Sequence, residues 1–116
     1  MKKYFAILFA CSAFITTTSS AQQKIEKYCE VHCSERAFAI NSVKVVFLPG
    51  KADSLFSFKD TTIRANLENV EQFQTITDVL NYMSSLNWEL AAATGVGSEH
   101  YFYFKKIFDR SEISTP

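Results

Sequence analysis

The sequence predicts an α+β fold of two layers, in which an antiparallel sheet of four to five strands carries one amphipathic helix on one face. Three observations predict it: short segments that alternate apolar and polar residues, one segment with apolar residues three and four positions apart, and a glycine-containing turn between two strand-like segments. The predicted order of elements is β-β-β-α-β-β. The 116 residues, of which 47% are hydrophobic, suffice for one domain.

Composition excludes several classes of protein. Twelve basic residues balance twelve acidic ones, and neither charge gathers in a tail, so we expect no nucleic-acid partner. Three glycines and two prolines exclude a low-complexity chain.

Residues 1–21 are typical of a secretory signal peptide. Met1-Lys2-Lys3 is a positive start, and a run of about a dozen mostly apolar residues follows, too short to span a bilayer. Small residues then lead to a predicted cleavage site after Ala21. We expect an exported bacterial protein, periplasmic or secreted, with one domain over 22–108 and a polar, flexible tail over 109–116.

Leu8-Phe9-Ala10-Cys11 also resembles a lipobox, which would make the product an outer-membrane lipoprotein acylated at Cys11. Phe9 fits that motif poorly, and the apolar run continues past Cys11. We therefore expect a membrane association only if Cys11 is lipidated.

Three strands are predicted before the helix. Residues 25–33 alternate, with Cys29 and Cys33 on one side and His32 on the other. Residues 42–48 form the strongest β segment, which Pro49-Gly50 ends, and 55–59 form a third strand. We expect residues 60–74 to be irregular, and pairing of this segment with an edge of the sheet is an open alternative.

The helix is predicted over 76–86. Thr75 is the N-cap with Asp78 three residues later, and Asn87 is suited to the left-handed conformation at the C-terminal end. One stripe collects the apolar side chains, namely Ile76, Val79, Leu80, Met83 and Leu86.

A β-hairpin of 88–94 and 99–107 is predicted to follow, with a turn at Gly95-Val96-Gly97-Ser98. Trp88, Leu90 and Ala92 are expected on one side of the first strand. In the second strand, alternation places Phe102 and Phe104 in the core and Tyr101, Tyr103, Lys105 and Ile107 on the other face.

The segment 75–106 resembles small bacterial domains of the DUF4177 type and, more closely, small exported proteins of Bacteroidetes. The resemblance rests on the helix Asp78-Val79-Leu80-Asn81-Tyr82-Met83, then Leu86-Asn87-Trp88-Glu89-Leu90, then an aromatic strand ending Phe104-Lys105-Lys106. It departs at Asn87, where the family usually has glycine. The resemblance implies a fold and no catalytic residue, because these families have no established activity.

Cys29, His32 and Cys33 have the composition of a metal site but not its spacing. On a strand the two cysteines lie about 13 Å apart, beyond disulfide reach unless the chain bends. Buried free thiols, a local bridge, and metal or redox chemistry are the three interpretations, in that order of preference. No cofactor is expected.

His100 and Glu89 are weaker candidates. His100 has no predicted partner for a nucleophilic triad, and Glu89 is expected on the solvent side of its strand. Tyr101, Tyr103 and Lys105 form a candidate surface for a ligand or partner.

The leading functional hypothesis is an exported, non-enzymatic domain that acts through surface interaction or oligomerisation, with an unknown protein or a second copy as partner. A second hypothesis is a module that binds a sugar or peptide at Tyr101 and Tyr103. The third is a thiol or redox protein centred on Cys29 and Cys33.

Overall fold

The computed structural model describes residues 23–36 and 42–114 of the chain. The predicted leader 1–21, with Cys11 and its alternative processing, lies outside the described residues. Within the described ranges, no helix combines the length and apolar character needed to cross a membrane.

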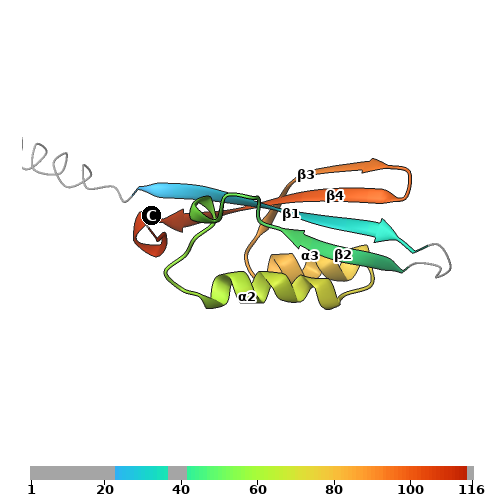
Figure 1. Ribbon diagram of the computed structural model, residues 1–116, viewed down its shortest axis with the longest axis horizontal. Helices are drawn as coiled ribbons and strands as arrows, with labels where there is room; N and C mark the ends of the chain where they lie inside the picture. Colours follow the sequence, from blue (N-terminus) through green and yellow to red (C-terminus); the bar gives the residue numbers. More distant parts are fainter. Residues whose placement is uncertain (1–22, 37–41, 115–116) are drawn as a thin grey trace, which may run out of the picture.

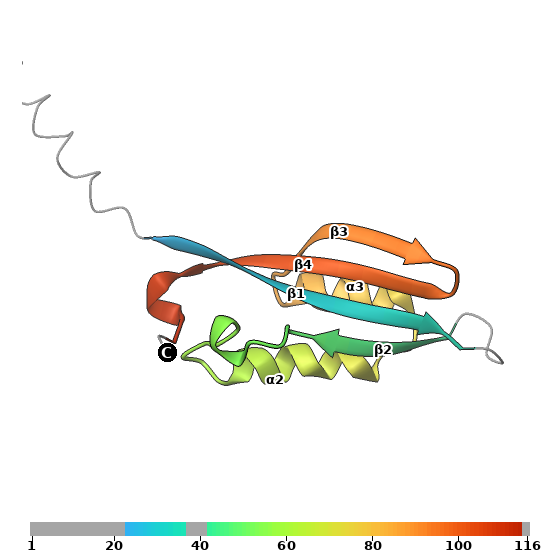
Figure 2. The ribbon, with the colours of Figure 1, turned by 45° about the horizontal axis from the view of Figure 1, so that its top comes forward.

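The fold is mixed α+β, built on one four-stranded antiparallel sheet with the strand order β2-β1-β4-β3. The strands are β1 (Lys24–Glu35), β2 (Val43–Leu48), β3 (Glu89–Val96) and β4 (Glu99–Asp109). Two short helices, α2 (Thr62–Glu68) and α3 (Ile76–Ser85), lie on the same side of the sheet (Figures 1 and 2). Three 3₁₀ turns complete the fold: η1 (Asp53–Leu55), η2 (Asn69–Gln72) and η3 (Arg110–Glu112).

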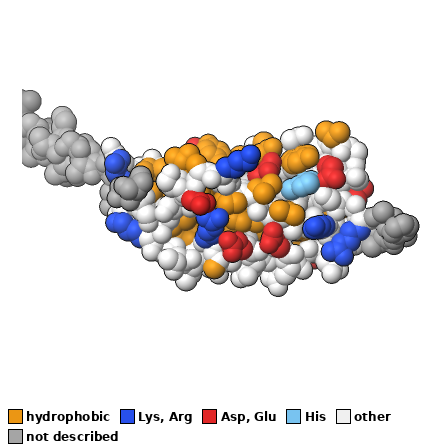
Figure 3. Space-filling model, viewed as in Figure 1, with side chains coloured by type: hydrophobic (Ala, Val, Ile, Leu, Met, Phe, Trp, Pro, Cys, Tyr) orange, Lys and Arg blue, Asp and Glu red, His pale blue; other side chains and the backbone are white. Residues whose placement is uncertain are grey.

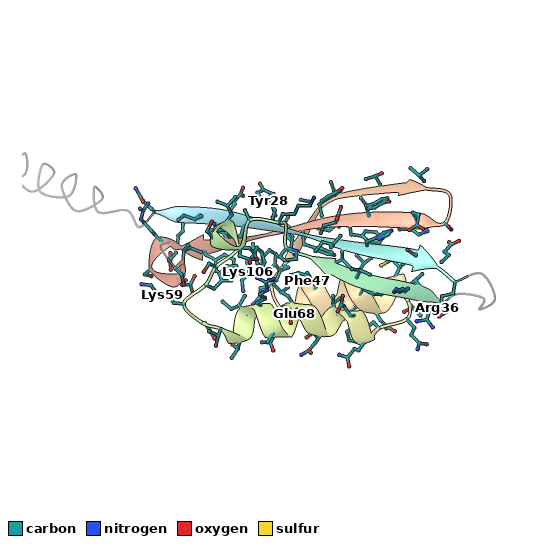
Figure 4. All side chains as sticks on the ribbon, in the orientation of Figure 1. Tyr28, Arg36, Phe47, Lys59, Glu68 and Lys106 are labelled. Atoms are coloured by element: carbon teal, nitrogen blue, oxygen red, sulfur yellow. The ribbon has the colours of Figure 1, made fainter. Side chains whose placement is uncertain are left out.

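The core lies between the sheet and the helices. Strand β1 contributes Cys29, Val31 and Cys33 to it, all buried, so the predicted alternation of this strand is confirmed. Figure 4 shows the same division of sides: Phe47 and Lys106 lie toward the helices, whereas Tyr28 lies on the opposite side of the sheet. The two inner strands, β1 and β4, thus each bury one face in the core.

The predicted helix over 76–86 is confirmed, and so are its ends. The Asp78 amide donates to Thr75 Oγ1 over 3.2 Å, and Asn87 has φ of 65°. Val79 and Met83 are fully buried, whereas the other three residues of the stripe are half-buried. Trp88 then packs between the rings of Phe56 and Phe108.

The expected third strand and single helix are not what the structure shows. Phe56 and Phe58 are buried, but the segment 55–59 makes only one isolated bridge, from Phe58 to Ile113, because the chain leaves the sheet after β2. Residues 60–74, expected to be irregular, contain α2 and η2. Leu67 and Val70 are buried and lie about one helical turn apart. The sequence did not reveal this helical spacing, because apolar and polar residues alternate from Ile63 to Leu67 as they would in a strand.

Two predictions about the C-terminal part also need correction. A register shift between Leu90 and Ala92 places these residues opposite Phe104 and Tyr103, hence on different faces rather than on one side. The segment from Asp109 was expected to be a flexible tail, but η3 follows the strand, with Asp109 and Glu112 forming a capping box. The described fold therefore continues past Phe108 to Ser114.

Candidate binding face on the open side of the sheet

The face of the sheet opposite the helices carries the candidate surface predicted from sequence. Tyr101, Tyr103 and Lys105 alternate with the buried Phe102 and Phe104 along β4, so all three point away from the core. In the described part of the chain, no helix lies over this side of the sheet (Figures 1 and 2). We call it the open face, and its central residues are Tyr28, Glu30, His32, Tyr101, Tyr103 and Lys105.

Pairing of β1 with β4 assembles these residues into rows. His32 lies opposite Tyr101, Glu30 opposite Tyr103, and Tyr28 opposite Lys105. The rings of His32 and Tyr101 stack with centroids 4.6 Å apart and planes within 2° of parallel. This stack holds both rings in one orientation on the open face.

A carboxylate anchors the stack at one end. Ser34 Oγ donates to Glu99 Oε2 over 2.7 Å, and His32 Nε2 contacts the same carboxylate oxygen. The hydrogen bond from Ser34, followed by that from His32, lowers the pKa of Glu99 below its ordinary value. The Glu99 carboxylate is therefore held in its ionised form beside the imidazole.

These three groups do not form a nucleophilic triad. In a triad one imidazole nitrogen contacts the acid and the other takes the proton of the nucleophile. Here Nε2 of His32 faces both Glu99 and Ser34, and the serine hydroxyl donates to the carboxylate instead. The arrangement orients the His32 ring rather than activating Ser34.

Tyr28 and Tyr103 are the exposed aromatic side chains of the open face, at 54% and 37% exposure. The Tyr28 hydroxyl donates to Glu26 Oε2 over 2.8 Å, and this contact raises the pKa of Tyr28. A hydrogen bond to Glu30 likewise raises the pKa of Tyr103. Both hydroxyls therefore stay protonated, and the carboxylates beside them orient the rings.

The two cysteines belong to the opposite side of β1. Both are free and buried, as the preferred interpretation predicted. Burial raises the pKa of Cys29 from 9.0 to about 12 and that of Cys33 from 9.0 to about 11. Because the thiolate is the reactive form, this environment does not favour the thiol or redox hypothesis.

The remaining candidates lie on different sides of the sheet. His100 pairs with Cys33 across the sheet, and its Nε2 lies 3.2 Å from Glu35 Oε1. Glu89 is exposed at the start of β3, on the solvent side as expected, and lies opposite Lys105 at the border of the open face. Among the described residues, no group of three or more His, Cys, Asp or Glu side chains could hold a metal ion.

Sequence reasoning did not include His32 and Tyr28 in the candidate surface. Their positions in the alternation of 25–33 already placed them on the side of the strand that faces away from the cysteines. The sequence did not show which strand pairs with residues 25–33. Once β1 lies beside β4, both residues become neighbours of the predicted tyrosines.

Comparisons with known proteins identify no family for this chain. No protein-family model, curated protein or solved structure matches it. The resemblance to DUF4177-type domains stays a prediction from the residues, and the geometry of the open face carries the functional proposal.

Proposed function

We propose that this chain is an exported, non-enzymatic domain that acts by binding a partner protein through its open face. The observation that carries the proposal is a layer of exposed aromatic and apolar side chains on the side of the sheet that the described helices leave uncovered. The predicted leader 1–21 supports the export of the domain.

Exposed apolar side chains concentrate on this face. Tyr28, Leu48, Tyr103 and Ile107 are 54%, 40%, 37% and 57% exposed. Leu48 and Tyr103 both pair with Glu30, so they lie in one row across β2, β1 and β4. Single exposed apolar residues are ordinary on a protein surface, whereas a contiguous group is typical of an interaction site.

The charges of the open face resemble the rim of a protein interface. Lys105 Nζ lies 3.9 Å from Glu26 Oε1, and Glu99 is engaged by Ser34 and His32, so these charges are satisfied within the domain. Hydrophobic side chains gather over the strands among isolated acidic and basic ones (Figure 3). Aromatic residues surrounded by paired charges are enriched in protein interfaces.

A photo-crosslinking analogue of phenylalanine in place of Tyr103 tests the proposal in cells that export the chain. We expect one discrete protein adduct, because Tyr103 lies at the centre of the open face. The same analogue in place of Thr77, which is exposed on α3, is the matched control. Equal labelling from both positions, or none from Tyr103, would contradict binding through the open face.

A double variant adds a second readout. Tyr28→Ala with Tyr103→Ala removes the two most exposed rings, so we expect it to abolish the adduct when the analogue is placed at the neighbouring Ile107. Exposed substitutions change the free energy of unfolding by only about 0.5 kcal/mol, so the melting temperature should stay close to that of the parent. A lost adduct with unchanged stability assigns the effect to the surface.

A sugar or peptide ligand is the second candidate for the open face. It is favoured by the tyrosine hydroxyls of Tyr28 and Tyr103, each oriented beside a carboxylate, since such a ring can stack on a sugar while its neighbours accept hydrogen bonds. Titration with oligosaccharides and short peptides, followed by amide NMR shifts, distinguishes this candidate. Shifts confined to the β1 and β4 positions of the open face, without a protein adduct, would favour it over the partner protein.

A further inference from the structure

The two edges of the sheet differ in whether other residues occupy their outward-facing backbone amides. At the β2 edge, the Phe47 amide donates to Glu71 Oε2 over 3.0 Å, and the Val43 amide donates to the Gln74 carbonyl over 2.8 Å. Glu71 of η2 and Gln74, which follows η2, thus occupy backbone donors that another strand would need. The β2 edge is therefore closed to further pairing.

Strand β3 forms the other edge and lacks such protection. All eight of its residues are exposed, and among the described strands its only neighbour is β4. From Leu90 to Ser98 the sequence has no charged residue and no proline, the side chains that most often guard an edge strand. Figures 1 and 2 show β3 as the outermost strand, and no described segment lies beyond it.

We propose that β3 pairs antiparallel with β3 of a second copy of this chain, so that two four-stranded sheets join into one eight-stranded sheet. An edge strand that pairs with its own copy about a two-fold axis is self-complementary, because each residue meets its symmetry partner in reverse order. The strand carries no charge over the paired segment, so no like charges oppose each other.

The register follows from the faces of β3. The bulge ends the regular pairing at Ala92, which leaves Ala92–Val96 as the regular segment before the turn. Ala92 and Thr94 lie on the open face, opposite Tyr103 and Tyr101, whereas Ala93 and Gly95 lie on the helix side, opposite Phe102 and His100. A two-fold axis at Thr94 keeps every side chain on its own face.

This register fits the side chains. Thr94 meets its own copy, Ala93 meets Gly95, and Ala92 meets Val96, which is 73% exposed in the single chain. Glu89 and Glu99 fall outside the five paired residues. A cross-strand pair of threonines stabilises an antiparallel sheet, and the small side chains of the other pairs meet without a steric clash.

Only five residues of each chain pair, so the buried area falls below the standard interface of about 1,600 Å². We therefore expect a concentration-dependent dimer rather than a permanent one. The joined sheet would carry the open faces of both copies on one side. Three strand spacings would separate the two Tyr101 residues by about 14 Å.

Disulfide trapping tests the register in the full chain carrying Cys11→Ser. Thr94→Cys places two cysteines directly opposite each other, at Cα spacing compatible with a disulfide. We expect mild oxidation to convert most of the Thr94→Cys protein into a covalent dimer. Ala92→Cys is the matched control: its two copies would lie about 13 Å apart, beyond disulfide reach, so we expect no dimer above background.

Sedimentation over a range of protein concentrations tests the dimer without a cross-link. We expect the parent chain to dimerise as its concentration rises and Thr94→Lys to remain monomeric, because two lysines would face each other on the axis. Thr94 is exposed, so circular dichroism should show an unchanged fold. A parent chain that stays monomeric into the millimolar range, or equal trapping of Ala92→Cys and Thr94→Cys, would overturn the proposal. The covalent dimer of Thr94→Cys is measured with the purified chain and needs no partner protein, so its formation or absence does not depend on whether the Tyr103 adduct forms.

Discussion

Cys29 and Cys33 face the helices, whereas His32, which lies between them in the chain, faces the open side of the sheet. The alternation of a strand thus divides three chemically active side chains between two environments. The thiols are buried among apolar side chains and stay neutral. The imidazole instead meets Tyr101 and Glu99 at the surface. The side chains that can contact a ligand or partner are therefore those of the open face, whereas the two cysteines are buried.

Thiol titration checks this division. In the Cys11→Ser chain we expect Cys29 and Cys33 to react with a thiol reagent only after denaturation, and an added Thr77→Cys to react at once. Below pH 9.0 both thiols are neutral in the folded and in the unfolded chain, so burying them carries no ionisation penalty and the folded state keeps its full stability. As the pH rises above 9.0, the thiols ionise in the unfolded chain while those of the folded chain stay neutral. The folded state therefore loses stability until the pH reaches the folded pKa, about 11 for Cys33 and about 12 for Cys29. Rapid labelling of the folded protein at neutral pH would contradict the burial.

The end of α3 shows how one element positions the next. The Trp88 amide donates to the Met83 carbonyl and the Asn87 amide to the Ser84 carbonyl, at 3.0 and 2.9 Å, which is the hydrogen-bond pattern of a Schellman motif. Asn87 supplies the left-handed residue that this motif requires. The chain then turns sharply enough to bring Trp88 into the core before β3 begins.

Substitution of Asn87 tests the motif. We expect Asn87→Ala to lower the free energy of unfolding by about 1 kcal/mol, because alanine lacks the short polar side chain that lets asparagine adopt a positive φ at low cost. Asn87→Gly should match or exceed the parent, because glycine adopts this conformation without strain. Thermal denaturation of the two variants measures the difference. Equal melting temperatures for both would mean that the conformation of residue 87 does not limit stability.

At the scale of the whole molecule, the C-terminal segment closes the end of the core. The Ser114 amide donates to the Ser57 carbonyl, the Lys59 amide donates to the Glu112 carbonyl, and Ile113 pairs with Phe58. Phe58 in turn packs on Phe108, with ring centroids 4.7 Å apart. The segment after β4 thus holds the long connection between β2 and α2 against the sheet.

Limited proteolysis tests this closure. We expect Ile113→Asp to accelerate tryptic cleavage after Lys51 and Lys59, because a carboxylate placed against Phe58 would detach the connection. Ser111→Asp introduces the same charge at an exposed position and is the matched control. Cleavage at the parent rate in both variants would show that the C-terminal segment does not protect the connection.

Predictions from the sequence succeeded where the signal was local. The strands at 25–33 and 42–48, the helix with its caps and the C-terminal hairpin each show their pattern within about twenty contiguous residues or fewer. Helix α2 was missed because Ile63-Arg64-Ala65-Asn66-Leu67 fits a strand as well as a helix turn. The bulge after Leu90 was missed because alanines on both sides carry no signal for a register shift.

The candidate site was predicted in part for the same reason. Alternation along β4 placed Tyr101, Tyr103 and Lys105 on one face. His32 and Glu99 are 67 residues apart in the chain, and only the pairing of β1 with β4 brings them together. Such contacts depend on the order of strands in the sheet, which no contiguous segment encodes.

The sequence by itself determined which side chains of each strand share a face and where α3 begins and ends, because the backbone conformation and periodicity of a short segment depend on its own residues. Only the tertiary structure decided which strands are neighbours, that α2 and α3 cover the same side, and that β3 forms an unguarded edge. Those choices depend on the free energy of packing residues that are distant in the chain, so the open face and the β3 edge emerge only when the sheet is assembled.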